Sequence, residues 1–490
     1  MAPDSPRRAP RAAALLLALL CLPNPLGAQQ KLTLQDAIAL ARKQSHQALA
    51  ARDARDASRH RTGAFNARLL PQLSLSGTVP AYNRSIIQVV QPDGTTLFRP
   101  QQQTNAALTA TLSQKLPFTG GDLFVSSSLS RLTVSGQQSV ETWSSTPVRF
   151  GLRQDIFRPN TLSWDRKEQS IDSELRERLY LEAMEDVAIQ TTQAFFDMYT
   201  ARTAFDNAVT NAAVNDTLYT LNKGRYEVGK IGENDLLQSE LALLRARTSV
   251  EQARLQYERT TAALRLALNL PPATPLEIEV GSDVPDVRPD TAVAVTQAMR
   301  NRSVVTDVEL QDVQARRAVT QARLAQGIGA TVQASFGFNA TAPEASQAYQ
   351  NLLEARQFTL SVEVPLWQWG AHGNDVSAAR LDQERVSTLS EETLQQTQHE
   401  AHFAALELTQ AYRNLALVAK ADTVAGKRFE VAYNRYVIGR ISIDNLYIAQ
   451  SEKDAALTQF VQGLRSYWLA YYRLRRATLY DFEAGQPIGS

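Results

Sequence analysis

Two short segments, RYEVGKI at residues 225–231 and RYVIGRI at residues 435–441, decide how this sequence folds. They begin 210 residues apart, and each has a leucine seven positions past its glycine, at Leu236 and Leu446. The same spacing continues downstream without a gap. Self-similarity of this kind indicates that a chain repeats one supersecondary unit. We therefore expect two tandem copies of one structural repeat.

A proline-rich stretch separates the two copies. Residues 271–290 contain five prolines, and proline at that density cannot continue a helix. We predict one repeat over residues 29–280 and the second over residues 281–490. The residues before position 29 form a different kind of segment, which is treated next.

The first 28 residues have the features of a secretory signal peptide. Arg7, Arg8 and Arg11 precede an apolar run at residues 12–22, and a small-residue cleavage site follows at residues 26–28. The sequence has one cysteine, Cys21, so an exported chain without this segment has no disulfide or reactive thiol. Lipid attachment at Cys21 is the alternative interpretation, and Leu20 before it fits that pattern poorly.

Each repeat is expected to contain the same order of helices. An alanine-rich helix opens it, a strand region follows, and a very long helix then turns at a glycine into a return helix. Apolar residues in the return helices follow a 3,4 spacing, which is typical of coiled coils, and many of them are small. One chain cannot bury such long apolar seams alone, so we expect association with further copies. The predicted helices are 34–68, 162–223 and 235–270, and then 292–326, 375–434 and 444–480.

Alternating apolar and polar residues predict strands in both halves. The first half has up to four, near 72–80, 105–116, 122–134 and 147–156, and a turn at 117–121 separates the second from the third. The second half has two, around Phe336 and Leu360. Outside residues 12–22 the sequence has no long uninterrupted apolar run, so these strands fit either a soluble sandwich or a membrane β-barrel. Four to six strands are too few to close a porous barrel, so closure would need several chains.

Composition and motifs argue against catalysis and against nucleic-acid binding. The net charge is +1, without the basic excess that nucleic acid attracts. Gly224 to Lys230 nearly matches a phosphate-binding loop, but Ile231 stands where a hydroxyl would hold magnesium. His399 and His402 share a helical face without a third metal ligand. We therefore predict no enzyme, no cofactor and no metal site.

The chain resembles the TolC-like outer membrane efflux proteins over nearly all of its exported part. The resemblance is carried by the tandem repeat, by the Arg-Tyr-x-x-Gly tip in both halves, and by the sequence PLWQW at residues 365–369 after a strand. Residues 34–41 also look like the usual start of the family. Each of these features alone is a weak signal, but their shared order in both halves is specific to this family.

The resemblance implies a mainly α-helical fold with membrane β-strands. Three chains would form one outer-membrane β-barrel, continued by a long periplasmic coiled-coil barrel of α-helices. Family members give four strands each to a barrel of twelve, and the additional strand-like region near residues 117–146 departs from this. The implied partners are two further copies of the chain, outer membrane lipid, a periplasmic adaptor protein and an inner-membrane pump.

The resemblance also assigns roles to residues at the two turns. The adaptor would meet the turns at residues 228–232 and 438–442, and the same region would form a gate, in which Tyr436 and Asp235 occupy the places of a Tyr–Asp link. An acidic ring beyond the second tip is not expected, since Asn445 and Ile448 stand at its positions with Asp444 adjacent. The tip residues are Val228, Gly229, Lys230, Ile231 and Gly232, and Ile438, Gly439, Arg440, Ile441 and Ser442.

The implied function is a passive exit duct of a tripartite efflux system, which carries small molecules out of the cell. Two alternatives remain open at this point. Within the family, the chain could serve a type I protein secretion system. In a different class, it could be a periplasmic coiled-coil scaffold without a pore.

Overall fold

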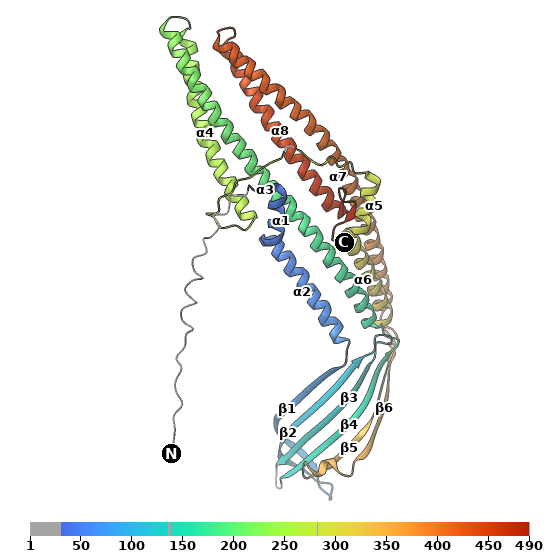
Figure 1. Cartoon of the computed structure of the whole chain (residues 1–490). Coiled ribbons are helices and arrows are strands. Elements are labelled where there is room, and N and C mark those ends of the chain that lie inside the picture. Colours follow the sequence, from blue (N-terminus) through green and yellow to red (C-terminus); the bar gives the residue numbers. More distant parts are fainter. Residues whose placement is uncertain (1–30, 136–138, 282, 490) are drawn as a thin grey trace, which may run out of the picture. The chain divides into compact units, whose positions relative to one another are not determined.

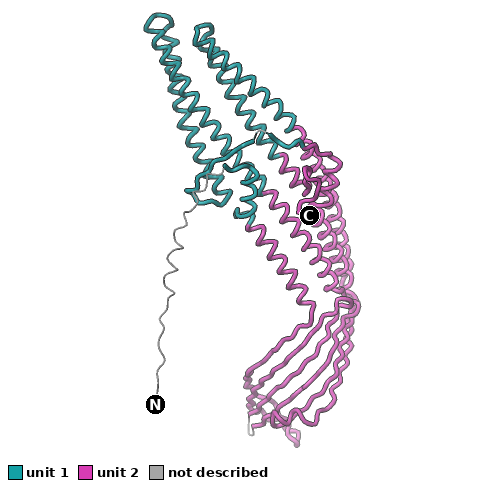
Figure 2. Tube along the Cα trace, viewed as in Figure 1, with its two compact units in different colours: residues 1–48, 187–286, 411–469 teal, residues 49–186, 287–410, 470–490 magenta. Residues whose placement is uncertain are grey.

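A computed structural model describes residues 31–135, 139–281 and 283–489. The predicted signal peptide, with Cys21, lies outside these residues. The chain divides into two compact units, each built from three stretches of sequence (Figure 2). Unit 1 is residues 1–48, 187–286 and 411–469, and unit 2 is residues 49–186, 287–410 and 470–490. Each unit therefore takes residues from both predicted repeats.

The helices follow the predicted order in both halves (Figure 1). The two longest, α3 and α7, have 67 residues each, which corresponds to about 100 Å at the usual helical rise. The return helices α4 and α8 begin at Glu233 and Ile443, again 210 residues apart. The described helices are α1 (Leu34–Gln44), α2 (His46–Arg68), α3 (Thr161–Glu227), α4 (Glu233–Ala267), α5 (Thr291–Asn301), α6 (Ser303–Ala325), α7 (Ala371–Val437) and α8 (Ile443–Thr478).

The two opening helices, predicted as single helices over 34–68 and 292–326, are each broken in two. Ser45 between α1 and α2 has extended backbone at φ −62° and ψ 150°, and its hydroxyl accepts a hydrogen bond from the N–H of Ala48 at 3.1 Å. Arg302 between α5 and α6 is also extended. A serine that caps the next helix offers the backbone an alternative to continued helix, which explains the break at Ser45.

Unit 2 contains one antiparallel sheet in the order β1-β2-β3-β4-β5-β6 (Figure 1). The prediction of up to four strands in the first half and two in the second is confirmed, although β1, β2 and β4 are longer than predicted. The turn at 117–121 is also confirmed, with Gly120 at φ 78°. The strands are β1 (Gln72–Val90), β2 (Thr96–Lys115), β3 (Asp122–Ser135), β4 (Val140–Ile156), β5 (Gly329–Ala342) and β6 (Leu353–Glu363), followed by a small hairpin of β7 (Tyr480–Asp481) and β8 (Gln486–Pro487).

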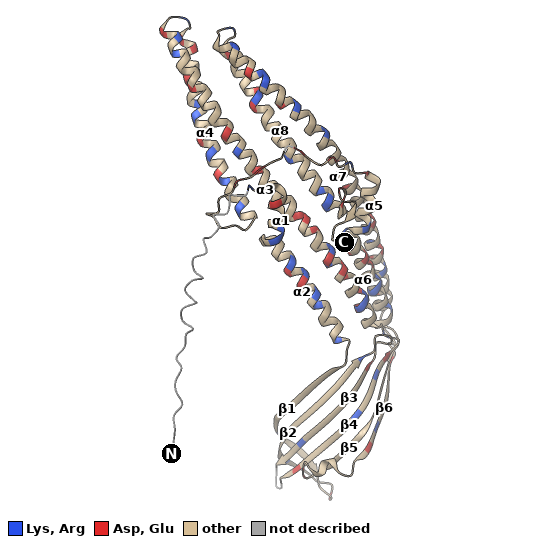
Figure 3. Cartoon of the chain, in the orientation of Figure 1, with Lys and Arg blue, Asp and Glu red and all other residues tan. Residues whose placement is uncertain are grey.

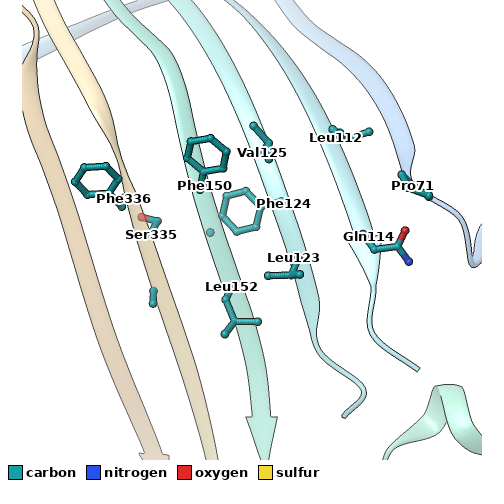
Figure 4. Close-up of a pocket in the computed structure, with 12 residues that line it drawn as sticks. Pro71, Leu112, Gln114, Leu123, Phe124, Val125, Phe150, Leu152, Ser335 and Phe336 are labelled. Carbon is teal, nitrogen blue, oxygen red and sulfur yellow. The ribbon is translucent and has the colours of Figure 1, made fainter. Parts of the chain in front are cut away.

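The register of the sheet separates an apolar face from a polar one. Residues that pair across antiparallel strands point to the same face. One row runs through Leu112, Val125 and Phe150 to Phe336, and these four residues are among those that line a mostly apolar pocket (Figure 4). On the opposite face, a row through Thr111 and Ser126 reaches Arg149. The strand alternation seen in the sequence therefore produces two chemically distinct faces.

Buried charges connect four helices of unit 2. The guanidinium of Arg302 lies 3.0 Å from Glu182 of α3 and 3.1 Å from Glu400 of α7, and it is 7% exposed. Arg475 of α8 donates to Glu185, and the next residue, Arg476, donates to Asp186. Arg302 ends α5 in extended backbone because its side chain is held in this network, which explains the second helix break.

Among the described residues, no helix carries an apolar stretch long enough to cross a membrane.

Candidate gate at the helical tips

The two tips of unit 1 have the same backbone geometry. Gly229 and Gly439 adopt left-handed conformations at φ 70° and φ 75°, where glycine has no steric penalty. In both tips the glycine N–H donates to the carbonyl three residues earlier, and the following N–H donates to a carbonyl five residues earlier. This ends the ascending helix and reverses the chain, so both glycines are required by the turn.

Most of the predicted tip residues are exposed. Val228 is 68% exposed and Ile438 is 65% exposed, although both are apolar. Ile231 and Ile441 are half-buried and the other eight predicted tip residues are exposed. The tips thus present apolar side chains that unit 1 itself does not cover.

Tyr436 forms a buried link between the two helical hairpins, α3–α4 and α7–α8. Its hydroxyl donates to the side-chain oxygen of Asn222 on α3 at 2.7 Å, and Tyr436 is 5% exposed. The predicted partner was Asp235, and that pairing is corrected, because the single hydroxyl hydrogen of Tyr436 is directed to Asn222. Asp235 lies half-buried in the first turn of α4. The ring of Tyr436 packs with Leu218, Ile443 and Leu446 in one buried cluster.

Two further contacts join the hairpins near this link. The guanidinium of Arg225 lies over the ring of Tyr436, 5.3 Å from its centroid, and donates to the carbonyl oxygen of Val437 at 3.0 Å. Gln238 in the second turn of α4 donates to Asp444 in the first turn of α8 at 2.7 Å. The first hairpin therefore holds the second through a tyrosine, a cation over its ring and an amide–carboxylate pair.

Comparisons with known proteins show which fold the chain shares. Residues 122–270 match the family model for outer membrane efflux proteins. The chain superimposes on the CmeC outer membrane channel of Campylobacter jejuni with a TM-score of 0.66 at 16% identity, covering 93% of this chain and 87% of CmeC. It also superimposes on the outer membrane protein VceC of Vibrio cholerae with a TM-score of 0.65 at 13% identity, covering 91% and 95%.

The resemblance to the TolC-like outer membrane efflux proteins is confirmed.

One curated relative also matches part of the chain. Protein CyaE of Bordetella pertussis is 24% identical over 212 residues, which are 43% of this TolC-like chain. The chain spans 44% of the length of that relative. The open state of the MtrE outer membrane channel of Neisseria gonorrhoeae superimposes with a TM-score of 0.63 at 14% identity, covering 91% of this chain and 88% of MtrE.

Past the second tip of this TolC-like protein, the predicted gate positions differ in their environment. Asp444 and Asn445 are exposed, and Ile448 is 50% exposed. Tyr447 between them is mostly buried, and burial raises the pKa of its hydroxyl to about 12, with smaller contributions from Tyr436 and Asp444. Its hydroxyl has no hydrogen-bond partner among the described residues. A buried hydroxyl without a hydrogen-bond partner therefore packs against the cluster that surrounds Tyr436.

Sequence reasoning missed a row of amides on α3. Asn207 and Asn211 donate to the two carboxylate oxygens of Asp454 on α8 at 2.8 Å and 2.7 Å. Asn215 and Asn222 continue the row and are buried. Three polar atoms of the row, one each on Asn211, Asn215 and Asn222, have no partner among the described residues. Asparagines spaced at four, four and seven residues share one helical face, and this spacing could have revealed the row.

Proposed function

We propose that the chain is the outer-membrane channel of a tripartite efflux system and acts as a passive exit duct for small molecules. The two-faced sheet carries this proposal. Its apolar face is exposed, with Leu73 at 77%, Phe358 at 73% and Leu360 at 53%. A membrane strand presents this pattern, because lipid covers the apolar face and water wets the other.

The distribution of charge supports a membrane location for the sheet. Figure 3 shows Lys, Arg, Asp and Glu along the helices, and few of them on the strands. The first twelve residues of β1, Gln72 to Asn83, carry no charge. A transmembrane strand needs about 9–11 residues, so this segment is long enough. Three copies of the chain would close the sheet into a barrel in the outer membrane.

The helical tips are the proposed docking surface for a periplasmic adaptor. The adaptor would join the channel to an inner-membrane pump, which supplies the energy. The exposed Val228 and Ile438 give each tip an apolar contact, and the adjacent Lys230 and Arg440 give each a positive charge. Small apolar anchors with a charged rim are typical of a transient protein interface.

The links between the hairpins are the proposed gate. Opening would move the second hairpin away from the first and exchange one packing of the helices for another. The row of amides on α3 supports this, since a polar interface with unsatisfied atoms is weaker than an apolar one. The chain's own part is therefore mechanical, and it needs no cofactor and no catalytic residue.

The test is the basal ion current of the purified protein in planar bilayers. Replacement of Tyr436 by Phe removes the hydroxyl that bonds Asn222, and Asn222→Ala removes the acceptor. Each variant should raise the open probability about tenfold, since one hydrogen bond contributes about 0.5–1.5 kcal/mol and a tenfold change is about 1.4 kcal/mol. The control is Tyr226→Phe, the repeat counterpart of Tyr436 in the first tip, which is 42% exposed.

The outcomes are distinct. Raised current in both gate variants with an unchanged Tyr226→Phe supports the gate. Unchanged current in Tyr436→Phe and Asn222→Ala contradicts the gate while leaving the channel intact. A purified protein that passes no current in any form contradicts the channel and favours the scaffold.

A further inference from the structure

The sheet of one chain has six strands, and its two outer strands have free edges. Each inner strand is bonded on both sides, whereas β1 pairs only with β2 and β6 only with β5 in the described sheet. We propose that all six strands enter the barrel wall, that β1 of one copy pairs with β6 of the next, and that three copies form eighteen strands instead of twelve. This inference rests on the proposed function, because it assumes a trimeric channel.

The strand ladder excludes the simpler arrangement, in which β1 and β2 stand apart from a twelve-stranded wall. In that case β3 would pair with β6 of the neighbouring copy. The edge of β3 that would be needed is already occupied by β2, in a register that runs without a break from Lys115↔Asp122 to Gln102↔Ser135. Freeing that edge would leave a whole row of backbone N–H and C=O groups unpaired.

The side chains of β1 and β2 fit a barrel wall. Leu73 pairs with Leu112 and Leu75 with Ala110, on the same face as the apolar row of β3 to β6. Ser74 and Ser76 lie on the polar face. A hairpin that projected into water would have no reason to continue the apolar face of the sheet. The part of the β1–β2 hairpin next to β3 therefore has the alternation of a strand pair with one face in lipid.

The two free edges also suit each other. Proteins protect exposed edges with charges, prolines or bulges. Here the bulge after Thr78, Pro80 and the charges of Glu354, Arg356 and Glu363 lie outside the stretches 72–78 of β1 and 357–362 of β6, which contain no charge and no proline. An even number of strands in this order makes β6 and the next β1 antiparallel, as in the rest of the sheet. Such unprotected edges fit a second copy of this chain as their partner.

The other part of the β1–β2 hairpin extends beyond the end of β3. A bulge separates Thr78 from Ala81, and β3 ends opposite Gln102 at Ser135. Ile86 to Val90 pair with Thr96 to Pro100, beyond the last residue of β3. Among the described residues, β1 and β2 thus continue beyond Ser135 as a two-stranded extension.

A wall of eighteen strands changes what the exit admits. With strands about 4.8 Å apart and tilted by about 40°, eighteen strands give a backbone diameter of about 36 Å, against about 24 Å for twelve. The polar face is lined largely by short hydroxyl side chains, such as Ser74, Ser76 and Ser128, which leave the lumen open. The exit would pass bulky hydrophilic solutes that a twelve-stranded barrel excludes.

Disulfide cross-linking in the full chain tests the wall. Ser76 of β1, Thr109 of β2 and Ser128 of β3 lie at one level across the sheet. Ser76→Cys is combined in turn with Gln357→Cys, Thr359→Cys and Ser361→Cys, which lie on the polar face of β6. After oxidation in isolated outer membranes, at least one pair should give reducible cross-linked dimers and trimers on a denaturing gel. The described residues contain no cysteine, so background cross-links are absent.

Two controls make the result decisive. The register pair Ser76→Cys with Thr109→Cys should form a bond within one chain, which reports that oxidation works. Ser128→Cys combined with the same three β6 positions should give no cross-link, since β3 lies inside the wall. Cross-links from Ser128 and none from Ser76 overturn the eighteen-stranded wall and indicate twelve strands. No cross-link from Ser76, with an intact heat-modifiable trimer and ion current, also overturns it and leaves the channel standing. Loss of trimer and current together contradicts the proposed function itself.

Discussion

At the residue scale, the proposed gate combines one hydroxyl that has a hydrogen-bond partner with one that has none. Tyr436 donates to Asn222, whereas Tyr447, which packs against the same buried cluster, has no partner among the described residues. A buried polar group without a partner costs about 1–3 kcal/mol. The hydroxyl of Tyr447 thus destabilises the same packing that the hydroxyl of Tyr436 stabilises.

Replacement of Tyr447 by Phe should therefore stabilise the tips by about 1 kcal/mol. The substitution also removes one cause of the loss of stability at alkaline pH. Burial raises the pKa of Tyr447 to about 12 in the folded chain, above its ordinary value of about 10. Ionisation of this hydroxyl therefore leaves the stability unchanged below pH 10 and lowers it as the pH rises from 10 towards 12. Thermal unfolding followed by circular dichroism from pH 8 to pH 12 should show a smaller alkaline loss in Tyr447→Phe.

The exposed Tyr226 gives the matched control for this experiment. Tyr226→Phe should unfold like the unmodified chain at every pH, because its hydroxyl reaches water in the folded state. If Tyr447→Phe proved less stable than the unmodified chain at pH 8, the hydroxyl would have a partner and its assignment as unsatisfied would be incorrect.

A residue of the proposed gate could be predicted from the sequence only where its role depends on its neighbours along the chain. The turn at Gly229 and Gly439 is local, since a left-handed residue between two helices favours glycine, and it was predicted correctly. The partner of Tyr436 depends on which face of α3 meets α7. Spacing along one helix does not determine that, and the amide of Asn222 took the place assigned to Asp235.

At the scale of elements, the interface between the helical hairpins combines an apolar cluster with a row of amides. Leu218 and Leu446 pack in the cluster around Tyr436, while Asn211 and Asn215 lie about two turns and one turn before Leu218 on α3. Asn215 is 5% exposed, and its side-chain oxygen has no partner among the described residues. Amides in a helix interface fix register and reduce stability, so this row suits an interface that must separate and re-form.

Replacement of Asn215 by Leu should strengthen the interface by about 1–3 kcal/mol, through apolar burial and loss of the unsatisfied oxygen. In the Tyr436→Phe background, the substitution should shorten the open periods of single channels about tenfold, which corresponds to about 1.4 kcal/mol. Thr217→Leu, on the exposed side of the same helix turn, should leave the open periods unchanged. Equal effects of both substitutions would show that the amide row has no part in gating.

The order of elements was predictable from the sequence because each carries a clear period. The 3,4 spacing in α4 and α8 and the alternation in β1 to β6 are properties of single segments. The breaks at Ser45 and Arg302 carry no such period: Ser45 breaks its helix through a local cap on Ala48, and Arg302 depends on contacts with distant residues. Arg302 is fixed by Glu182, which lies 120 residues earlier in the sequence. Charge pairs between distant elements leave no periodic signal.

At the scale of the whole molecule, the sheet requires both lipid and further copies of the chain. Its apolar face has no cover within one chain, and its outer strands have free edges. The long rows of small residues on the helices are a further reason to expect contacts with other copies of the chain. The proposed trimer in the outer membrane would satisfy all three requirements at once, so membrane insertion and assembly should depend on the same face of the sheet.

Substitutions at two adjacent positions of β6 test which face of the sheet lies against lipid. Leu360→Arg places a charge on the apolar face, which costs about 2–4 kcal/mol at the centre of a bilayer, and Ser361→Arg places the same charge on the polar face, next to water. We expect Ser361→Arg to assemble as a heat-modifiable trimer in the outer membrane fraction, and Leu360→Arg to yield at least tenfold less trimer. Gels of unheated and heated membranes measure this directly. Equal trimer yields from the two variants would mean that lipid does not cover the face that contains Leu360, and a chain found only in the osmotic-shock fluid would mean that no channel forms.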